Sequence, residues 1–246
     1  MSDLQQVYGV HAVIALLQHH PRRVKQLFLL QGRDDASVHE LLALAAEHRI
    51  EVRQLERARL DEMTAGVHQG VLALVSASQV WGEPMLDELL DRRGSELLLL
   101  VLDGVTDPHN LGACLRTADA AGVDAVIVPK DKSATLNATV RKVACGAAEV
   151  VPLVAVTNLA RMLQKLQRRG VWIVGTAGEA GQSLYQQQLS GPLALVMGAE
   201  GKGMRRLTRE HCDYLVSLPM RGSVGSLNVS VATGICLFEI QRQRGV

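Results

Sequence analysis

Three short segments of this sequence place glycines and polar side chains directly after apolar runs, which is where chemistry is to be expected. In the first, Pro108 stands in a polar turn, and Asn110-x-Gly112-x-x-x-Arg116 opens a helical stretch. Side chains on a helix lean toward its N-terminus, so we expect Arg116 to point back toward Asn110 across the space left by Gly112. An amide and a guanidinium would then share one cavity. The alternative is a helix cap at Asn110 and a surface arginine.

The second segment is Met197-Gly198-Ala199-Glu200-Gly201, in which Glu200 stands where an apolar strand ends. Glycines at such a point let backbone amides and carbonyls approach a ligand closely. Only two residues separate Gly198 from Gly201, which does not satisfy the phosphate-loop pattern GxxxxGK[ST], and GxGxxG is not matched either. The segment therefore gives little support to binding of a nucleoside triphosphate or a dinucleotide.

The third segment runs from Leu218 to Ser230 and leads into an apolar helix with Val231, Ile235 and Phe238 on one face. Ser226 is the expected N-cap of that helix, and the small residues before it suit a loop that wraps a ligand in backbone hydrogen bonds. A flexible loop before a capped helix explains this composition. It does not explain why such segments recur after three strands.

The pattern from residue 97 onward predicts the scaffold that positions these segments. Apolar stretches of strand length alternate with amphipathic helices: the expected strands are 97–103, 125–128, 171–175 and 193–197, and the expected helices are 111–121, 138–145, 159–168 and 228–241. Continuous apolar strands separated by helices predict an α/β fold with a mostly parallel sheet covered on both faces. Ligands bind outside the carboxyl ends of the strands in such sheets, and the three segments fall there.

Residues 1–76 form a smaller α/β pattern and are predicted to be a separate N-terminal domain. Apolar spacing predicts helices over 10–17 and 38–48, a strand over 24–30 and short strands near residues 52 and 71. Residues 77–95, which contain Gly82, Pro84 and Gly94, are the predicted linker to a domain of residues 96–246.

Charge gives no global signal for a nucleic-acid partner. The net charge is +1, and residues 1–76 hold eight Lys and Arg against nine Asp and Glu. Arg22, Arg23, Lys25 and Arg33 cluster around one predicted strand, and a solvated face explains that cluster at least as well as contact with RNA. Any binding to nucleic acid must therefore come from local patches.

The composition also bears on location and on metal binding. The longest apolar run, Leu97–Leu102, is far shorter than the ~20 residues of a membrane span, and the first residues lack a signal-peptide pattern. We therefore expect a cytoplasmic, unprocessed protein with no membrane partner. The four cysteines, at 114, 145, 212 and 236, form no CxxC pair, so we expect reduced core residues and no metal site.

Together, the three segments resemble the three ordered motifs of the SpoU (TrmH-like) class of SPOUT methyltransferases. The stretches Tyr8–Val13 and Val67–Val71 are similar to the small N-terminal substrate-binding domain of these enzymes, which is related to a ribosomal-protein fold. The resemblance covers nearly the whole chain. Within the class it is nearest to the bacterial enzymes that methylate a guanosine 2′-hydroxyl in the peptidyl-transferase region of 23S rRNA, during rRNA processing and ribosome biogenesis. Methylation of a tRNA ribose is the alternative.

The resemblance implies a C-terminal domain with a deep trefoil knot that holds S-adenosylmethionine, large-subunit ribosomal RNA as partner, and a homodimer formed through that domain. The residues implied to bind the cofactor are Thr176, Met197, Gly198, Gly201, Leu218, Met220 and Leu227. Those implied to form the catalytic surface are Asn110, Arg116, Glu200, Ser226 and Asn228. The stripe of Val231, Ile235 and Phe238 could pack on a partner subunit or serve as ordinary core.

The implied chemistry is an in-line attack of a ribose hydroxyl on the sulfonium methyl group, so the protein mainly orients reactants and helps to remove a proton. The guanidinium group of arginine keeps its proton at neutral pH and so cannot accept another as a general base. We therefore expect Arg116 to bind the adjacent phosphate and to stabilise the negative charge that develops on the attacking oxygen. Glu200 is expected to orient Arg116 or Asn110. The rival hypotheses are a nucleotide-dependent α/β enzyme, which would need the missing phosphate loop, and a non-catalytic RNA-binding module, which intact motifs disfavour.

Overall fold

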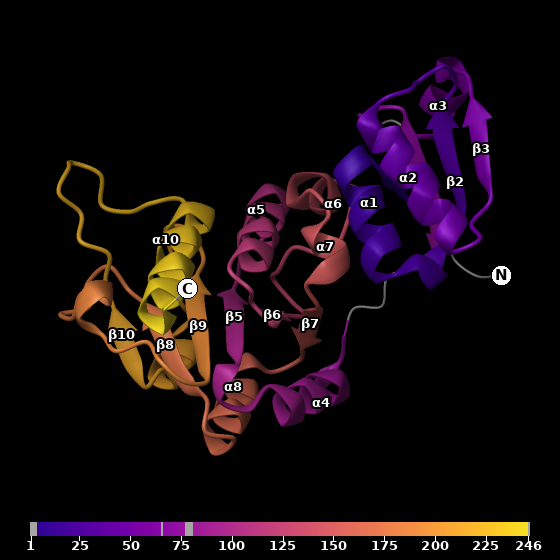
Figure 1. Ribbon diagram of the computed structural model, residues 1–246. Helices are drawn as coiled ribbons and strands as arrows, with labels where there is room; N and C mark the ends of the chain where they lie inside the picture. The colour runs from indigo at the N-terminus through magenta and orange to yellow at the C-terminus, as the bar shows by residue number, and fades with distance from the viewer. Residues whose placement is uncertain (1–3, 65, 77–80, 246) are drawn as a thin grey trace. The chain divides into compact units, whose positions relative to one another are not determined.

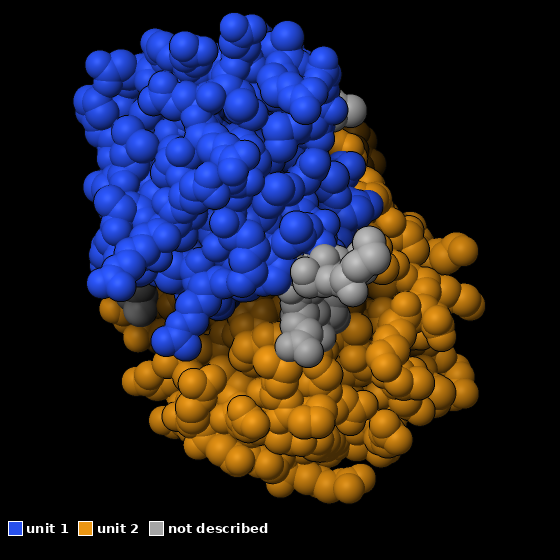
Figure 2. Space-filling model, turned by 90° about the vertical axis from the view of Figure 1, so that its right-hand side faces the viewer, with its two compact units in different colours: residues 1–79, 136–150 blue, residues 80–135, 151–246 orange. Residues whose placement is uncertain are grey.

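The computed structural model of the protein describes residues 4–64, 66–76 and 81–245 (Figure 1). The chain forms two compact units, coloured separately in Figure 2. Unit 1 contains residues 1–79 and 136–150, and unit 2 contains residues 80–135 and 151–246. The segment 136–150, which the sequence placed in the C-terminal domain, packs with the N-terminal residues instead.

Unit 1 is a mixed sheet flanked by helices. Its strands, in the spatial order β1-β4-β2-β3, are β1 (Leu4–Tyr8), β4 (Val71–Ser76), β2 (Val24–Leu30) and β3 (Val52–Leu55). Its helices are α1 (Val10–His19), α2 (Ala36–Glu47), α3 (Arg57–Met63), α6 (Ala138–Ala144) and α7 (Ala147–Val150), with a 3-10 turn η1 (Pro21–Arg23). Of the pairings between described strands, that of β2 with β3 is parallel, and β4 pairs antiparallel with both of its neighbours.

The two faces of this sheet are buried by different helices. Leu27 and Leu29 of β2 pack in one cluster with α1 and α2, whereas Phe28, between them, packs with Leu60 of α3. Successive side chains of a strand point to opposite faces, so the continuous apolar run of β2 reflects burial on both sides.

Two residues of the basic cluster around β2, Arg23 and Arg33, bind groups within unit 1. Arg23 donates from Nη1 to Oε2 of Glu149 over 2.7 Å, and Arg141 donates to the other oxygen of the same carboxylate, whose side chain is 1% exposed. Burial lowers the pKa of Arg141 to about 10. Arg33 donates to Asp35 and to the carbonyl of Gln69. Two of the four basic residues therefore have structural roles, and the two ion pairs with Glu149 help to explain why segment 136–150 belongs to unit 1.

Unit 2 is built on a sheet in which every pairing of the described strands is parallel. The spatial order is β10-β8-β9-β5-β6-β7, with β5 (Leu98–Asp103), β6 (Ala125–Pro129), β7 (Leu153–Val156), β8 (Trp172–Thr176), β9 (Leu193–Gly198) and β10 (Tyr214–Val216). Its helices are α4 (Glu83–Arg93), α5 (Pro108–Ala120), α8 (Leu159–Arg168), α9 (Arg206–Glu210) and α10 (Val229–Arg244), with 3-10 turns η2 (Gly94–Glu96) and η3 (Leu184–Gln186). The predicted α/β class with a mostly parallel sheet and a separate N-terminal unit is confirmed; the trefoil knot stays a prediction.

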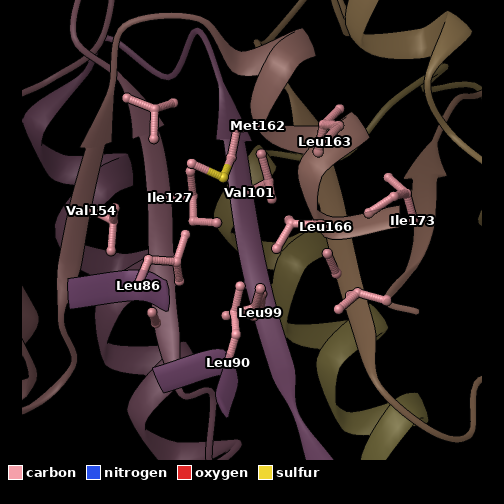
Figure 3. Close-up of a cluster of buried hydrophobic side chains, with 14 of the residues drawn as sticks. Leu86, Leu90, Leu99, Val101, Ile127, Val154, Met162, Leu163, Leu166 and Ile173 are labelled. Atoms are coloured by element: carbon pink, nitrogen blue, oxygen red, sulfur yellow. The ribbon is translucent and has the colours of Figure 1, made fainter. Parts of the chain in front are cut away.

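The packing of unit 2 fixes the edge on which a ligand can bind. One face of the sheet is buried under α4 and α8, where Leu86, Leu163 and Leu166 meet Val101 and Ile127 (Figure 3). Helix α10 packs on α5 and on β9 (Figure 1). Strands β6 and β7 lie on one side of β5, and strands β8, β9 and β10 lie on its other side. Of these later strands, β9 pairs directly with β5. The β5–β9 border is therefore the topological switch point, where open α/β sheets bind ligands.

Within the predicted linker, residues 83–93 form the helix α4. Leu86, Leu89 and Leu90 are buried in the core of unit 2, at the spacing of one helical face. Gly82 is the N-cap and Pro84 lies in the first turn, so these residues mark the start of a helix rather than a loop. Residues 77–80 of the linker lie outside the described residues.

Three smaller expectations can be compared with the structure. Cys114 and Cys236 are buried as expected, but Cys212 is half-buried and Cys145 is exposed at the end of α6. Strands β1, β7 and β10 were not anticipated, because they are short or lie near irregular sequence. None of the described helices combines the length and the apolar character that crossing a bilayer requires.

Candidate functional site

A cavity of about 680 Å³ opens at the carboxyl ends of β8, β9 and β10. Three stretches of chain supply most of its wall: residues 176–179 after β8, residues 197–203 after β9, and residues 225–229 before and at the start of α10. All seven predicted cofactor-binding residues line it, namely Thr176, Met197, Gly198, Gly201, Leu218, Met220 and Leu227. Glu200, Ser226 and Asn228, from the predicted catalytic surface, also line it.

The loop after β9 is closed on itself by backbone hydrogen bonds. The amide of Ala199 donates to the carbonyl of Gly203 over 3.1 Å, and the amide of Gly203 donates back over 2.8 Å. A Cβ atom at Gly198 would lie 2.3 Å from both the carbonyl carbon of Gly203 and the amide nitrogen of Met204. Only glycine fits there, because the neighbouring atoms are backbone and have little freedom to retreat. The glycines of this segment thus shape a tight loop that presents Glu200.

Glu200 is the centre of a polar cluster formed by all three sequence segments. Its Oε1 accepts hydrogen bonds from Nδ2 of Asn228 at 2.6 Å, from Nδ2 of Asn110 at 3.2 Å, and from the amide of Val229 at 3.2 Å. Asn228 Nδ2 also donates to Oδ1 of Asn110 over 2.9 Å. The expectation that Glu200 orients Asn110 agrees with this geometry.

The helix caps beside the cluster differ from those expected. Asp107, whose carboxylate accepts from the amide of His109, caps α5, so Asn110 is the third residue of that helix rather than its cap. Asn228, not Ser226, caps α10: its Oδ1 accepts from the amide of Ser230 at 2.9 Å. An asparagine cap leaves the amide nitrogen available, and Asn228 uses it to hold Glu200.

Arg116 lies on the exposed side of α5, and neither it nor Asn110 is among the residues that line the cavity. The expected shared cavity for these two side chains is therefore not the one described above. Arg116 follows Asn110 by six residues, which in an α-helix corresponds to a rotation of about 600° about the helix axis. This is about 120° short of two full turns, so the two side chains leave α5 on different sides. The structure places Arg116 on the surface of the helix that carries Asn110, where a large substrate can reach it.

Several cavity residues were missed by the motifs. Lys202 and Arg209 add positive charge to the wall, and Arg209 pairs with Glu179. Val216 and Ala232 add apolar surface. In the sequence these residues are marked only by their position: at a strand end, beside a motif, or in the first turns of the last helix. Such a position is too common to identify a cavity residue.

The lining of the cavity suits S-adenosylmethionine. Apolar side chains of Met197, Leu218 and Leu227 offer a surface for a purine ring, and the glycine-rich loops bring backbone amides and carbonyls to the wall. The hydroxyl of Thr176 is already bonded to the carbonyl of Val196. The volume lies within the ~300–1,000 Å³ of typical cofactor sites. Among the described residues no group of three or more His, Cys, Asp or Glu is placed to hold a metal ion.

The site is thus a cavity at the carboxyl ends of the parallel strands β8, β9 and β10, with Glu200 and Asn228 at its wall and both bonded to Asn110 outside the lining. The chain belongs to the SpoU rRNA methylase family, whose model matches residues 97–238. A second model, for RNA 2′-O ribose methyltransferase substrate binding, matches residues 6–81.

Curated relatives and solved structures agree with this assignment. The chain is 75% identical over 244 residues to the 23S rRNA (guanosine-2′-O-)-methyltransferase RlmB of Pseudomonas aeruginosa, covering 99% of this chain and 98% of that protein. It is 72% identical over 246 residues to the protein of the same name from Pseudomonas putida, covering 100% and 99%. The SpoU methyltransferase AviRb of Streptomyces viridochromogenes, solved in complex with AdoMet, is 26% identical with a TM-score of 0.80, covering 98% of this chain and 90% of that one.

Proposed function

We propose that this protein transfers a methyl group from S-adenosylmethionine to the ribose 2′-hydroxyl of a guanosine in 23S rRNA, in the peptidyl-transferase region, during ribosome biogenesis in the cytoplasm. The observation that carries the proposal is the polar cluster in which Glu200 and Asn228, at the wall of the cavity, join Asn110 of the first motif segment. Relatives that match nearly the full chain at 75% and 72% identity are named for 23S rRNA, which favours rRNA over the tRNA alternative.

When bound in the cavity, S-adenosylmethionine supplies a methyl group that is already activated on a sulfonium. The work left to the protein is to hold a ribose hydroxyl in line with that methyl group and to stabilise the charge that develops on the attacking oxygen. We assign the backbone of residues 198–203 and 225–228 to holding the donor.

Glu200 acts in this scheme as an anchor rather than as the base. Three donors converge on its Oε1, and they tie the loop after β9 to the first turns of α5 and α10. The cluster thereby sets the orientation of Asn228 at the cavity wall and of Asn110 beside it. We assign Arg116 to the phosphate next to the target ribose and to the developing alkoxide, for which a planar guanidinium offers two parallel donors.

Calorimetry with the purified protein tests the cofactor assignment. S-adenosylmethionine should bind, and ATP at the same concentration should not compete with it, because the cavity lacks a phosphate loop. No binding of S-adenosylmethionine, or a preference for ATP, would reject the assignment. Methylation of a tRNA transcript in preference to a 23S rRNA fragment would support the alternative substrate.

We also propose a division of labour in which residues 1–76 bind RNA and the cofactor site is confined to unit 2. A chain that begins at Trp81 keeps all of α4 and the backbone bonds of Trp81 to Leu153 and Ala155. It should bind S-adenosylmethionine with unchanged affinity, and its efficiency of RNA methylation should fall by about 100-fold or more, because phosphate and base contacts supply most RNA affinity. Cofactor affinity serves as the control for folding. Full methylation efficiency would show that the N-terminal unit is not the substrate-binding domain.

The homodimer is proposed to form through α10. Val231 and Phe238, seven residues apart on this helix, are 51% and 53% exposed, and Ile235 between them is half-buried. This stripe is therefore not ordinary core within one chain, and a second copy can bury it in a symmetric contact.

Phe238→Asp should weaken the dimer by about 2 kcal/mol, or about 30-fold in Kd, because a central aromatic contact is lost and a charge is placed in its position. Light scattering across a dilution series measures the change. Leu207→Asp, which changes a similarly exposed side chain (51%) on α9, is the matched control. A wild-type protein that is monomeric and fully active at micromolar concentration would refute the dimer.

A further inference from the structure

Asp103, the last residue of β5, is a buried carboxylate that the three motifs leave without a role. Its side chain is 0% exposed, and it accepts two hydrogen bonds from one residue. The amide of Arg205 donates to Oδ2 over 2.8 Å, and Nε of Arg205 donates to Oδ1 over 2.6 Å. Burying a carboxylate is unfavourable unless donors replace its water, so this pair fixes the backbone of Arg205 firmly against the end of β5.

The pair lies at the base of the loop that presents Glu200. Asp103 is opposite Gly198 in the pairing of β5 with β9, so the loop begins beside it. Arg205 follows the closing residue of the loop, Gly203, after one intervening residue. The loop is therefore held at its start by the pairing of the strands and at its end by the carboxylate of Asp103.

The same carboxylate also stands at the start of the segment that leads to Asn110. Gly104, directly after it, has φ +84°, and a Cβ atom there would lie 3.6 Å from the Cβ of Ala199. The turn after β5 and the loop after β9 therefore run in close contact. A shift of Arg205 away from Asp103 would change the distance from Glu200 to Asn110, which is now 3.2 Å.

We propose that Asp103 and Arg205 are positioning residues for methyl transfer. They hold the loop of residues 199–203 so that Glu200 meets Asn110 and Asn228 and the loop backbone lines the cofactor cavity. The inference rests on the proposed function. Neither side chain lines the cofactor cavity, and both act through the loop.

A purely structural role makes a different prediction. Arg205 is the N-cap residue of α9, a helix of five residues without a side-chain cap. If the pair only supported this helix, its loss would lower stability, and the rate per folded molecule would not change. A positioning role instead predicts a lower kcat with an unchanged KM for RNA, because the displaced loop misplaces the reacting groups.

The test compares Arg205→Ala with Arg206→Ala in the full-length protein. Arg206 is the adjacent exposed arginine and, among the described residues, forms an ion pair with Glu210 one helical turn on, so it is a matched control. Arg205→Ala should lower the single-turnover methylation rate by about tenfold and weaken binding of S-adenosylmethionine several-fold, with KM for RNA unchanged. Arg205→Lys should recover part of the rate, and Asp103→Asn should resemble Arg205→Ala.

Hydrogen exchange of the peptide that contains residues 198–205 gives a readout independent of activity. Exchange should rise in Arg205→Ala and stay at the wild-type level in Arg206→Ala. The inference is overturned if Arg205→Ala keeps the rate of Arg206→Ala, or if its loss of rate follows only a loss of folded protein. Failure of the proposed function would look different, since the wild-type protein itself would then transfer no methyl group to RNA.

Discussion

Gly198→Ala is expected to weaken cofactor binding strongly while most of the fold survives. The new Cβ would lie 2.3 Å from the backbone of both Gly203 and Met204, so the loop that lines the cavity must move. Overpacking of this kind costs about 1–3 kcal/mol, and here the displaced atoms also form the binding site. We expect affinity for S-adenosylmethionine to fall by about 100-fold or more and methylation to fall with it.

Calorimetry measures the affinity, and thermal melting reports on the fold. Gly222→Ala is the matched control, because Gly222 lies in the loop before α10, is not at positive φ, and has nothing within 4 Å of the position a Cβ would take. If Gly198→Ala binds the cofactor as tightly as Gly222→Ala does, the loop after β9 does not shape the cofactor site.

Arg116→Ala should slow the chemical step by a factor on the order of 10² or more, because the guanidinium is assigned to charge that appears mainly in the transition state. The side chain is exposed on α5, so its removal leaves no cavity in the core. Cofactor affinity should change little, since Arg116 does not line the cavity. Arg116→Lys should rescue poorly, because an ammonium group lacks the forked geometry that binds phosphate and hydroxyl together.

Single-turnover methylation measured beside calorimetric cofactor binding separates the two effects. Arg92→Ala, which removes an exposed arginine near the end of α4, controls for a general loss of positive charge. A parallel loss of cofactor binding in Arg116→Ala would show that the residue supports the cavity, and its assignment to the transition state would then fail.

The sequence predicted four of the six described strands of unit 2, β5, β6, β8 and β9, because most of their residues are buried on both faces of the sheet. Such strands are continuous apolar runs, and β5 is buried along its whole length. The same reasoning failed for α4, where Pro84 and Gly94 suggested a linker although Leu86, Leu89 and Leu90 have helical spacing. The prediction gave more weight to the turn-forming residues at the two ends of this helix than to the short apolar stripe between them.

The candidate site was predictable only in part, for a physical reason. The residues that line the cavity lie at strand ends, so their position follows from the topology of the sheet. The hydrogen bond between Glu200 and Asn110 spans 90 positions of sequence, and the pairing of Asp103 with Arg205 spans 102. Local spacing carries no information about such contacts. The pattern likewise could not show that Arg23 and Arg141 meet on Glu149.

The central claim is that this cavity and its polar cluster transfer a methyl group to a guanosine ribose of 23S rRNA. Its most direct test is to incubate the purified protein with isotope-labelled S-adenosylmethionine and 23S rRNA that lacks the modification, and to identify the labelled nucleoside by mass spectrometry after digestion. The account predicts a single labelled product, 2′-O-methylguanosine. Label on a base, label on another nucleoside, or no transfer to 23S rRNA, either naked or in a precursor particle, would contradict it.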